Sequence, residues 1–181
     1  MTKIKIENIV AYAQISELLD IKLLSEKISN SSYDPLEFDG LSIKYDDEKI
    51  AVIVLRTGKI VCTGAKETTD AIDKIKKVTS EIKKIGFEIK KDYEIKIENI
   101  TVSTDLKKEL HLASIATGLI LQNVEYQPDV FAGLTYKMDE FCTILILFSA
   151  GKLVCTGAKN IDDATNSIKK MEEKLSAIGA L

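Results

Sequence analysis

A nine-residue segment occurs twice in this 181-residue chain and constrains its fold more than any other feature. Residues 58–66, GKIVCTGAK, return 93 residues further on as residues 151–159, GKLVCTGAK. Residues 4–10 likewise return as residues 95–101, at an offset of 91, and the two extra residues in the second copy fall in a loop. A match of this kind indicates one folding unit written twice. We therefore expect two repeats, residues 1–91 and residues 92–181.

Both repeats predict the same order of elements: a strand, a short helix, four strands and a long helix. In the first repeat we expect strands over 4–10, around Tyr33, and over 40–45, 50–56 and 59–63, with Thr63-Gly64 ending the last of these. The short helices are expected over 20–28 and 112–121. Apolar residues spaced three or four apart predict the long helices over about 71–85 and 161–178, and each is followed by glycine.

Composition excludes several classes of protein. No apolar run reaches the roughly 18 residues of a membrane span, and the charged N-terminus is unlike a signal peptide, so we expect a soluble cytoplasmic protein without membrane contact. The 3 cysteines and the single histidine match no metal-ligand spacing, and Cys62 and Cys155 are expected in the core. One histidine also leaves no catalytic set to assemble, so we predict neither an enzyme nor a cofactor.

The charge is distributed unevenly. The net charge of −3 would argue against a nucleic-acid partner, but residues 1–91 carry 16 Lys/Arg and 15 Asp/Glu, and residues 92–181 carry 9 and 13. The first repeat is therefore slightly basic and the second acidic, which leaves a nucleic-acid partner open.

Two strands, residues 50–55 and 144–148, are apolar on both of their faces, which is typical of a sheet covered on both sides. Two long helices cover only one side of a ten-stranded antiparallel sheet, so the other side would form an exposed apolar surface, which is typical of a binding site. Its members would be Ile53, Leu55, Val61, Ile146, Phe148 and Val154. Face-to-face stacking of the two halves as a sandwich is the alternative.

Polar residues that would lie on the same face of the sheet as these apolar residues indicate the ligand. If Val10, Val61 and Thr63 face outward, then Asn8 does too, and so do Asn99, Thr101 and Thr156 in the second repeat. This mixture suits the minor groove of A·T-rich DNA. Its floor offers the acceptors adenine N3 and thymine O2 to an amide, and the absent guanine amino group leaves room for methyl groups.

Three doubled motifs together resemble the TATA-box-binding proteins in their short archaeal form. They are Glu-Asn-Ile in the first strand of each repeat, Tyr-x-Pro-x-x-Phe-x-Gly-Leu beginning at Tyr33 and Tyr126, and the nine-residue segment. The resemblance extends from about Ile4 to Gly179. It implies an α+β fold in which two pseudo-symmetric repeats form a saddle-shaped, ten-stranded antiparallel sheet with helices on the convex face. It also implies minor-groove binding and DNA bending, for which this family is a standard example.

The resemblance implies a role for individual positions. The central base-contacting asparagines fall on Asn8 and Asn99. The small residues at the groove floor fall on Val10, Val61, Thr63, Thr101, Val154 and Thr156. The apolar wedges fall on Phe38, Leu55, Phe131 and Phe148. The phosphate-contacting cations fall on Lys44, Lys49, Lys59, Lys66, Lys137, Lys152 and Lys159. Ile53 and Ile146 complete the expected DNA-binding face.

Some residues depart from the family pattern. Leu55 stands where phenylalanine is expected, Thr101 where valine is expected, and Cys142 where a cation is expected. Asp39 follows the wedge Phe38 and places a carboxylate near DNA. The turn expected to meet transcription factor B contains Gln127, Asp129 and Val130, with one acidic residue replaced by Gln127.

The function implied is that of a general transcription initiation factor. Such a factor binds and bends TATA-box DNA and nucleates a pre-initiation complex with transcription factor B and RNA polymerase, at the nucleoid of a cell without a nucleus. A weak homodimer in the absence of DNA is left open. The alternatives are a divergent paralogue outside basal transcription, an accessory domain of a DNA glycosylase or nuclease, and a protein-interaction module that uses the apolar face.

Overall fold

The computed structural model describes residues 3–45, 49–119 and 123–181, and in them ten strands form one antiparallel sheet. The strand order is β2-β3-β4-β5-β1-β6-β10-β9-β8-β7. One sheet replaces the sandwich alternative. The chain divides into two compact units, which we call the Asn8 unit (Asn8–Glu98) and the Asn99 unit (Asn99–Leu181 together with the first residues of the chain, through Glu7). The predicted repeat boundary at residues 91 and 92 stays a prediction.

Both repeats have the predicted order of elements. The first repeat contains β1 (Lys5–Gln14), α1 (Ile21–Lys27), β2 (Ser31–Ser32), β3 (Gly40–Tyr45), β4 (Ile50–Leu55), β5 (Lys59–Ala65) and α2 (Thr68–Ile85). The second contains β6 (Lys96–Asp105), α3 (Leu112–Gly118), β7 (Val124–Glu125), β8 (Leu134–Met138), the 3-10 turn η2 (Asp139–Phe141), β9 (Thr143–Leu147), β10 (Lys152–Ala158) and α4 (Ile161–Ala177). The strand expected around Tyr33 lies two residues earlier, and the end predicted for the second short helix, Leu121, lies outside the described residues.

Capping residues set the helix ends. Asp20 caps α1 by accepting a hydrogen bond from the Leu23 backbone N–H at 3.0 Å, and Asn160 caps α4 by accepting one from Asp163 at 2.8 Å. The chain leaves α2 through Gly86 at φ 114°, a left-handed conformation that glycine adopts without strain. Each of these ends lies within one or two residues of the end that the sequence predicts.

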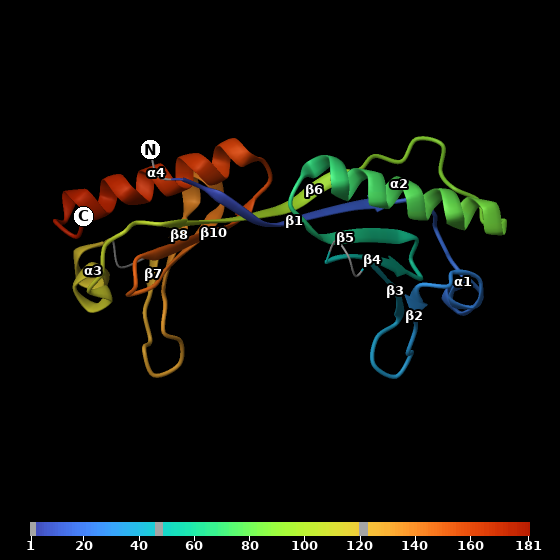
Figure 1. Cartoon of the computed structure of the whole chain (residues 1–181), viewed down its shortest axis with the longest axis horizontal. Coiled ribbons are helices and arrows are strands. Elements are labelled where there is room, and N and C mark those ends of the chain that lie inside the picture. The colour runs from blue at the N-terminus through green and yellow to red at the C-terminus, as the bar shows by residue number, and fades with distance from the viewer. Residues whose placement is uncertain (1–2, 46–48, 120–122) are drawn as a thin grey trace. The chain divides into compact units, whose positions relative to one another are not determined.

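Each long helix covers one face of its own unit (Figure 1). In the Asn8 unit, α2 buries Ala71, Ile75, Val78 and Ile82. The alternate residues of β1, β4 and β5 are buried as well, while the residues between them stay partly exposed. In the Asn99 unit, α4 buries Ala164, Ile168, Met171 and Leu175, whereas the two ends of its predicted stripe, Ile161 and Ile178, are exposed. We call the half-exposed face opposite the long helix the open face of each unit.

The last strand of each repeat extends further than the sequence predicts. Thr63-Gly64 does not end β5, because that strand continues to Ala65, just as β10 continues to Ala158. Gly64 and Gly157 have φ of 93° and 96°, and the pairing of these strands with β1 and β6 shifts register at this point. The repeated glycine therefore forms a β-bulge inside the strand, which turns its backbone N–H out of the ladder.

Candidate nucleic-acid interface

The open face of the Asn8 unit brings together the first-repeat residues predicted from strand parity. Asn8, Val10, Ile53, Leu55, Val61 and Thr63 are all half-buried. Val61 lies opposite Tyr12 on one side and Ile53 on the other, and Thr63 lies opposite Ala51. The residues between them, such as Ile9, Ile60 and Cys62, are buried on the opposite face. Strand alternation therefore separates the apolar core from a half-exposed surface with polar groups near its middle.

The open face of the Asn99 unit is built the same way. Asn99, Thr101, Ile146, Phe148, Val154 and Thr156 are half-buried. Ile146 lies opposite Val154, and Thr156 lies opposite Ile144, whose side chain is 42% exposed. Each unit thus presents one face that agrees with the sequence-based assignment, while the DNA-binding role of these residues stays a prediction.

A glycine of the bulge fixes the orientation of each central asparagine. The Gly64 backbone N–H donates to Asn8 Oδ1 at 2.7 Å, and Gly157 donates to Asn99 Oδ1 at the same distance. Because a backbone N–H needs an acceptor, the amide oxygen must face the bulge, and the donor group Nδ2 must occupy the other position. Asn8 Nδ2 then donates to Thr63 Oγ1 at 3.2 Å. Each unit therefore carries an amide donor held in one orientation.

Two of the predicted wedges, Phe38 and Phe131, lie on the loops that precede β3 and β8, which extend on the side of their unit away from the long helix (Figure 1). The other two lie at strand ends, Leu55 as the last residue of β4 and Phe148 directly after β9. Phe38 is 48% exposed and Phe131 is 46% exposed. A Cβ atom built on Gly40 would come within 2.3 Å of the Phe38 ring and 3.1 Å of Leu55, so both side chains lie directly over that glycine. Gly133 accommodates the Phe131 ring in the same way. Glycine at these two positions allows an aromatic ring to lie against the strand.

Different contacts hold the two wedge pairs. Phe131 and Phe148 meet edge to face, with ring centroids 6.0 Å apart and an interplanar angle of 72°. In the Asn8 unit, the residues next to the wedges form a bidentate ion pair, in which Arg56 Nη2 and Nε donate to the two carboxylate oxygens of Asp39 at 3.1 and 3.2 Å. Hydrogen bonding from Arg56 holds the pKa of Asp39 below its usual range. The carboxylate near the wedge is therefore paired with a cation.

The predicted phosphate-contacting lysines are at the surface. Six of them, Lys44, Lys49, Lys66, Lys137, Lys152 and Lys159, are exposed, and Lys59 is half-buried. Lys59 Nζ lies 4.6 Å from the centroid of the Tyr12 ring, and Lys137 pairs with Asp139 at 3.2 Å. Lys49 and Cys142 are equivalent in the repeat and share a left-handed backbone, with φ of 55° and 52°. The backbone conformation is therefore the same at these two positions, although Cys142 has no positive charge.

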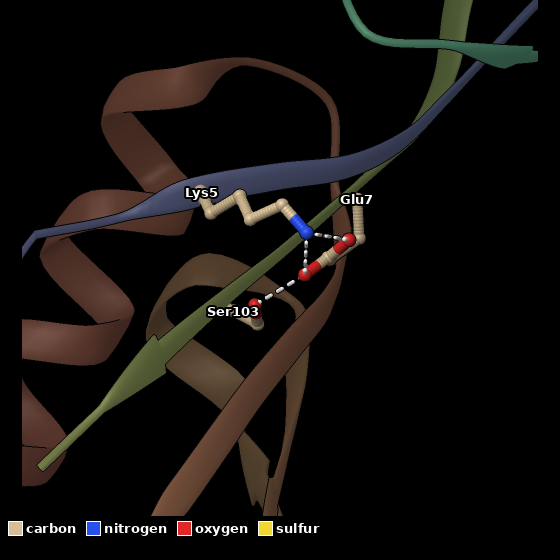
Figure 2. A network of polar contacts seen from close by, with 3 residues as sticks. All are labelled: Lys5, Glu7 and Ser103. Atoms are coloured by element: carbon tan, nitrogen blue, oxygen red, sulfur yellow. Dashed lines mark hydrogen bonds and ion pairs between the residues drawn. The ribbon is translucent and has the colours of Figure 1, made fainter.

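A carboxylate also borders the open face of the Asn99 unit (Figure 2). Glu7 Oε1 accepts from Ser103 Oγ at 2.6 Å, and Lys5 Nζ approaches the two carboxylate oxygens at 3.2 and 3.1 Å. Ser103 lies opposite Val154, so this network adjoins the predicted groove floor. In the first repeat, Tyr12 occupies the position of Ser103. Lys5 therefore supplies an opposite charge to the Glu7 carboxylate, and Ser103 supplies a hydrogen bond.

Sequence reasoning missed several residues of these faces. Tyr12, Ala51 and Ile144 share the open-face parity and could have been found by extending the alternation along β1, β4 and β9. The bulge glycines were also missed: the sequence predicts a strand end at Thr63-Gly64, although the recurrence of this glycine as Gly157, again after a threonine, was a signal. The predicted turn residues Gln127, Asp129 and Val130 are exposed, and the Gln127 carbonyl accepts from the Val130 and Phe131 N–H groups, each at 2.9 Å.

Two of the three cysteines are buried away from the open faces. Cys62 and Cys155 lie in the core as predicted, and burial raises the pKa of the Cys62 thiol to about 11 and also raises that of Cys155. Within residues 3–45, 49–119 and 123–181, no cluster of His, Cys, Asp and Glu is arranged to hold a metal ion. Of the helices in the same residues, none has the length and apolarity that crossing a membrane requires.

Comparisons with known proteins agree on one family. The profile of the family described as "Transcription factor TFIID (or TATA-binding protein, TBP)" matches residues 3–85 and again residues 94–178. The chain is 40% identical over 179 residues to a TATA-box-binding protein of Archaeoglobus fulgidus, covering 99% of this chain and 98% of that protein. It is 39% identical over 178 residues to TATA-box-binding protein E of Halobacterium salinarum, covering 98% and 96%.

A solved structure agrees with this result. The structure of Methanococcus jannaschii TBP superposes with a TM-score of 0.83 at 35% identity and covers 97% of this chain and 99% of that one. The predicted fold class, an antiparallel ten-stranded sheet with helices, is thereby confirmed, and the matching family is one of transcription factors and not of enzymes. The chain belongs to the TATA-binding protein family.

Proposed function

We propose that this protein is a general transcription initiation factor that binds and bends A·T-rich promoter DNA through the minor groove. The observation that carries the proposal is the pair of oriented amides, Asn8 and Asn99, each with its oxygen occupied by a glycine N–H. The minor groove of A·T pairs offers only acceptors, so it needs donors from the protein. An amide fixed in this way has its donor, and not its acceptor, on the side away from the bulge. Asn8 uses one N–H for Thr63 and has a second one for the groove, whereas the two N–H groups of Asn99 would exchange their threonine partners for groove acceptors.

The surroundings of each amide support the same ligand. Half-buried Val61, Ile53 and Val154 offer methyl groups to a groove floor that lacks the guanine amino group. The half-exposed rings of Phe38 and Phe131 are suited to entering a base step, because apolar wedges unstack and kink DNA from the minor-groove side. Exposed lysines around the faces would contact phosphates. The relatives at about 40% identity carry the name TATA-box-binding protein, which agrees with this ligand.

The test compares two duplexes of equal length, one A·T-rich and one G·C-rich, titrated at several salt concentrations. We expect salt-dependent binding that is much tighter to the A·T-rich duplex, together with increased energy transfer between dyes at its two ends. A minor-groove drug should compete for the site, whereas a major-groove ligand should leave binding intact. Equal affinity for both duplexes would refute the proposal and would favour a protein-interaction module.

Transcription factor B and RNA polymerase are the partners that we propose for the bound complex, at the nucleoid in the cytoplasm. The turn with exposed Gln127, Asp129 and Val130 is the proposed contact for transcription factor B. Because Gln127 replaces an acidic residue, Gln127→Glu should strengthen the ternary complex with that factor and promoter DNA, by a few-fold in a gel-shift titration. Unchanged ternary affinity would remove this turn from the contact.

A further inference from the structure

The amide in the Asn99 unit is surrounded by two hydroxyl groups, which distinguishes it from its counterpart. Asn99 Nδ2 donates to Thr156 Oγ1 at 3.1 Å and to Thr101 Oγ1 at 3.3 Å. The two hydroxyl oxygens lie 3.0 Å apart, and Thr156 Oγ1 lies 3.3 Å from Asn99 Oδ1. In the first repeat, Val10 stands in the place of Thr101, so a methyl group replaces one hydroxyl.

The hydrogen bond between the Thr101 and Thr156 hydroxyl groups can have either residue as its donor. If Thr101 donates to Thr156 and Thr156 donates to Asn99 Oδ1, Thr101 Oγ1 keeps one lone pair for a ligand, because it already accepts from Asn99. If Thr156 donates to Thr101, the Thr101 proton is available to an acceptor instead. The hydroxyl of Thr101 is therefore able to act as either acceptor or donor toward whatever lies on the open face.

A·T and G·C base pairs require different hydrogen-bonding partners in the minor groove. An A·T pair presents only acceptors there, whereas a G·C pair adds the guanine amino donor. Thr101 satisfies either one by rotating its hydroxyl. Val10 has nearly the same shape but no polar atom, so an amino group placed against it would lose its hydrogen bond to water without a replacement.

We infer that Thr101 makes the Asn99 unit tolerant of a guanine amino group in the minor groove, whereas Val10 makes the Asn8 unit exclude one. The inference rests on the proposed function and extends it, because it assigns base preference unequally to the two halves of the site. The two residues are half-buried on equivalent strands, so the contrast comes from one oxygen atom.

The experiment changes only the amino group. In an A·T-rich duplex, single adenines are replaced by 2,6-diaminopurine, which pairs with thymine but adds the minor-groove amino group of guanine. Affinity is measured with the replacement at each position of the site, for the parent, for Thr101→Val and for the matched variant Val10→Thr. An iron–EDTA group on Cys142, the exposed cysteine of the Asn99 unit, shows by DNA cleavage which half-site that unit covers.

For the parent we expect the amino group to weaken binding roughly tenfold in the half-site under the Asn8 unit and less than about threefold under the Asn99 unit. Thr101→Val should raise the smaller penalty to roughly tenfold, and Val10→Thr should lower the larger one to less than about threefold. Replacing a G·C pair by inosine·cytosine, which lacks the amino group, should remove the penalty in both half-sites.

Equal penalties in the two half-sites of the parent, or penalties that neither substitution alters, would overturn this inference while leaving A·T-rich binding in place. A parent that binds A·T-rich and G·C-rich duplexes equally well would instead refute the proposed function. The unmodified duplex serves as the internal reference, because each penalty is the ratio of one protein's affinities for the unmodified and the modified duplex, so that any change a substitution makes in binding to the unmodified duplex cancels.

Discussion

The open faces of the two units share one backbone arrangement, which we call the frame, and differ in the side chains around it. Both place an asparagine amide against a bulge glycine at 2.7 Å, and both seat a phenylalanine ring over a glycine. Around that frame, the Asn8 unit uses an exposed ion pair beside an aliphatic and an aromatic wedge, whereas the Asn99 unit uses an edge-to-face aromatic pair and a hydroxyl cluster. The parts that depend on backbone geometry are the same in both units, and the parts that depend on side-chain chemistry vary.

This contrast has an energetic consequence. An exposed ion pair contributes little and is screened by salt, because both groups are well hydrated in any conformation. An edge-to-face aromatic pair contributes about 0.5–1.5 kcal/mol beyond the area it buries and does not depend on ionic strength. We therefore expect the wedges of the Asn99 unit to be held more firmly than those of the Asn8 unit, and the difference should grow as salt is added.

The largest expected effect tests the shared frame. In Asn8→Asp or Asn99→Asp, the carboxylate still accepts from the bulge glycine, so the free protein should stay close to parental stability. The donor, however, becomes an anion facing an acceptor-lined floor, at a cost of about 3–5 kcal/mol in DNA binding. Asn→Ala should give the opposite order: it loses the glycine's acceptor, destabilising the fold by about 1–3 kcal/mol, and weakens binding less than Asp does.

Thermal unfolding measures the stability of the four variants, and DNA titration measures their affinity. The two Ala variants should be the less stable pair, and the two Asp variants should bind DNA more weakly. Asn99→Ala should be the more destabilised of the two alanine variants, because Asn99 also bonds to two threonines. If Asp and Ala variants bind DNA equally well, the amides do not face the groove.

The next effect concerns the wedges. Phe148→Ala removes a ring that packs against Phe131 and should weaken DNA binding by about 3–4 kcal/mol, the sum of lost burial and lost aromatic contact. Leu55→Ala removes burial alone and should cost about 2 kcal/mol. Equilibrium titration of both variants on one duplex measures the difference. Equal losses would show that the aromatic contact adds nothing to the complex.

A smaller effect is expected from a substitution that makes the wedges of the two units more alike. Leu55→Phe places a second ring beside Phe38, at the position where Leu55 packs near Gly40, and should tighten binding by about 1 kcal/mol. Energy transfer measured separately at the two ends of an oriented site should show unequal bending in the parent and more equal bending in the variant. A parent with equal bends, unaffected by the substitution, would mean that Leu55 is not a wedge.

The smallest effect tests the ion pair. Asp39→Ala supplies the residue that the second repeat has at this position, Ala132, and releases Arg56 to contact a phosphate. Affinity should then fall more steeply with salt, by up to about 0.9 in the slope of log K against log salt. Arg56→Ala is the matched control, because it removes the cation and should leave the slope no steeper than in the parent.

Lowering the pH should steepen the salt dependence of DNA affinity, as Asp39→Ala does, only when the carboxyl group of Asp39 becomes protonated. Because the pKa of Asp39 is lowered in the folded protein, the contribution of the ion pair is present above the usual carboxyl pKa and is lost as the pH falls through the lowered value. The salt slope of the parent should therefore be the same at pH 5 as at pH 7. A change between these two values would point to another titrating group.

The repeat, the order of elements and the residues of each open face could all be predicted from the sequence. These depend on local information, since the side chains of a strand alternate between its faces and apolar residues three or four apart share one face of a helix. Asn8, Val61 and Thr63 could be assigned to one face in this way, and so could their counterparts in the second repeat. The buried cysteines followed from the same alternation.

The orientation of these side chains could not be predicted in this way, because it depends on contacts between distant parts of the chain. The glycine that fixes Asn8 lies 56 residues away, and its N–H is available because a bulge turns it out of the ladder, which alternation does not predict. The ion pair of Arg56 with Asp39 and the edge-to-face contact of Phe131 with Phe148 likewise join residues 17 apart, across a strand pairing. Such contacts depend on register and on backbone torsion, which change a side chain's partner without changing the face on which it lies.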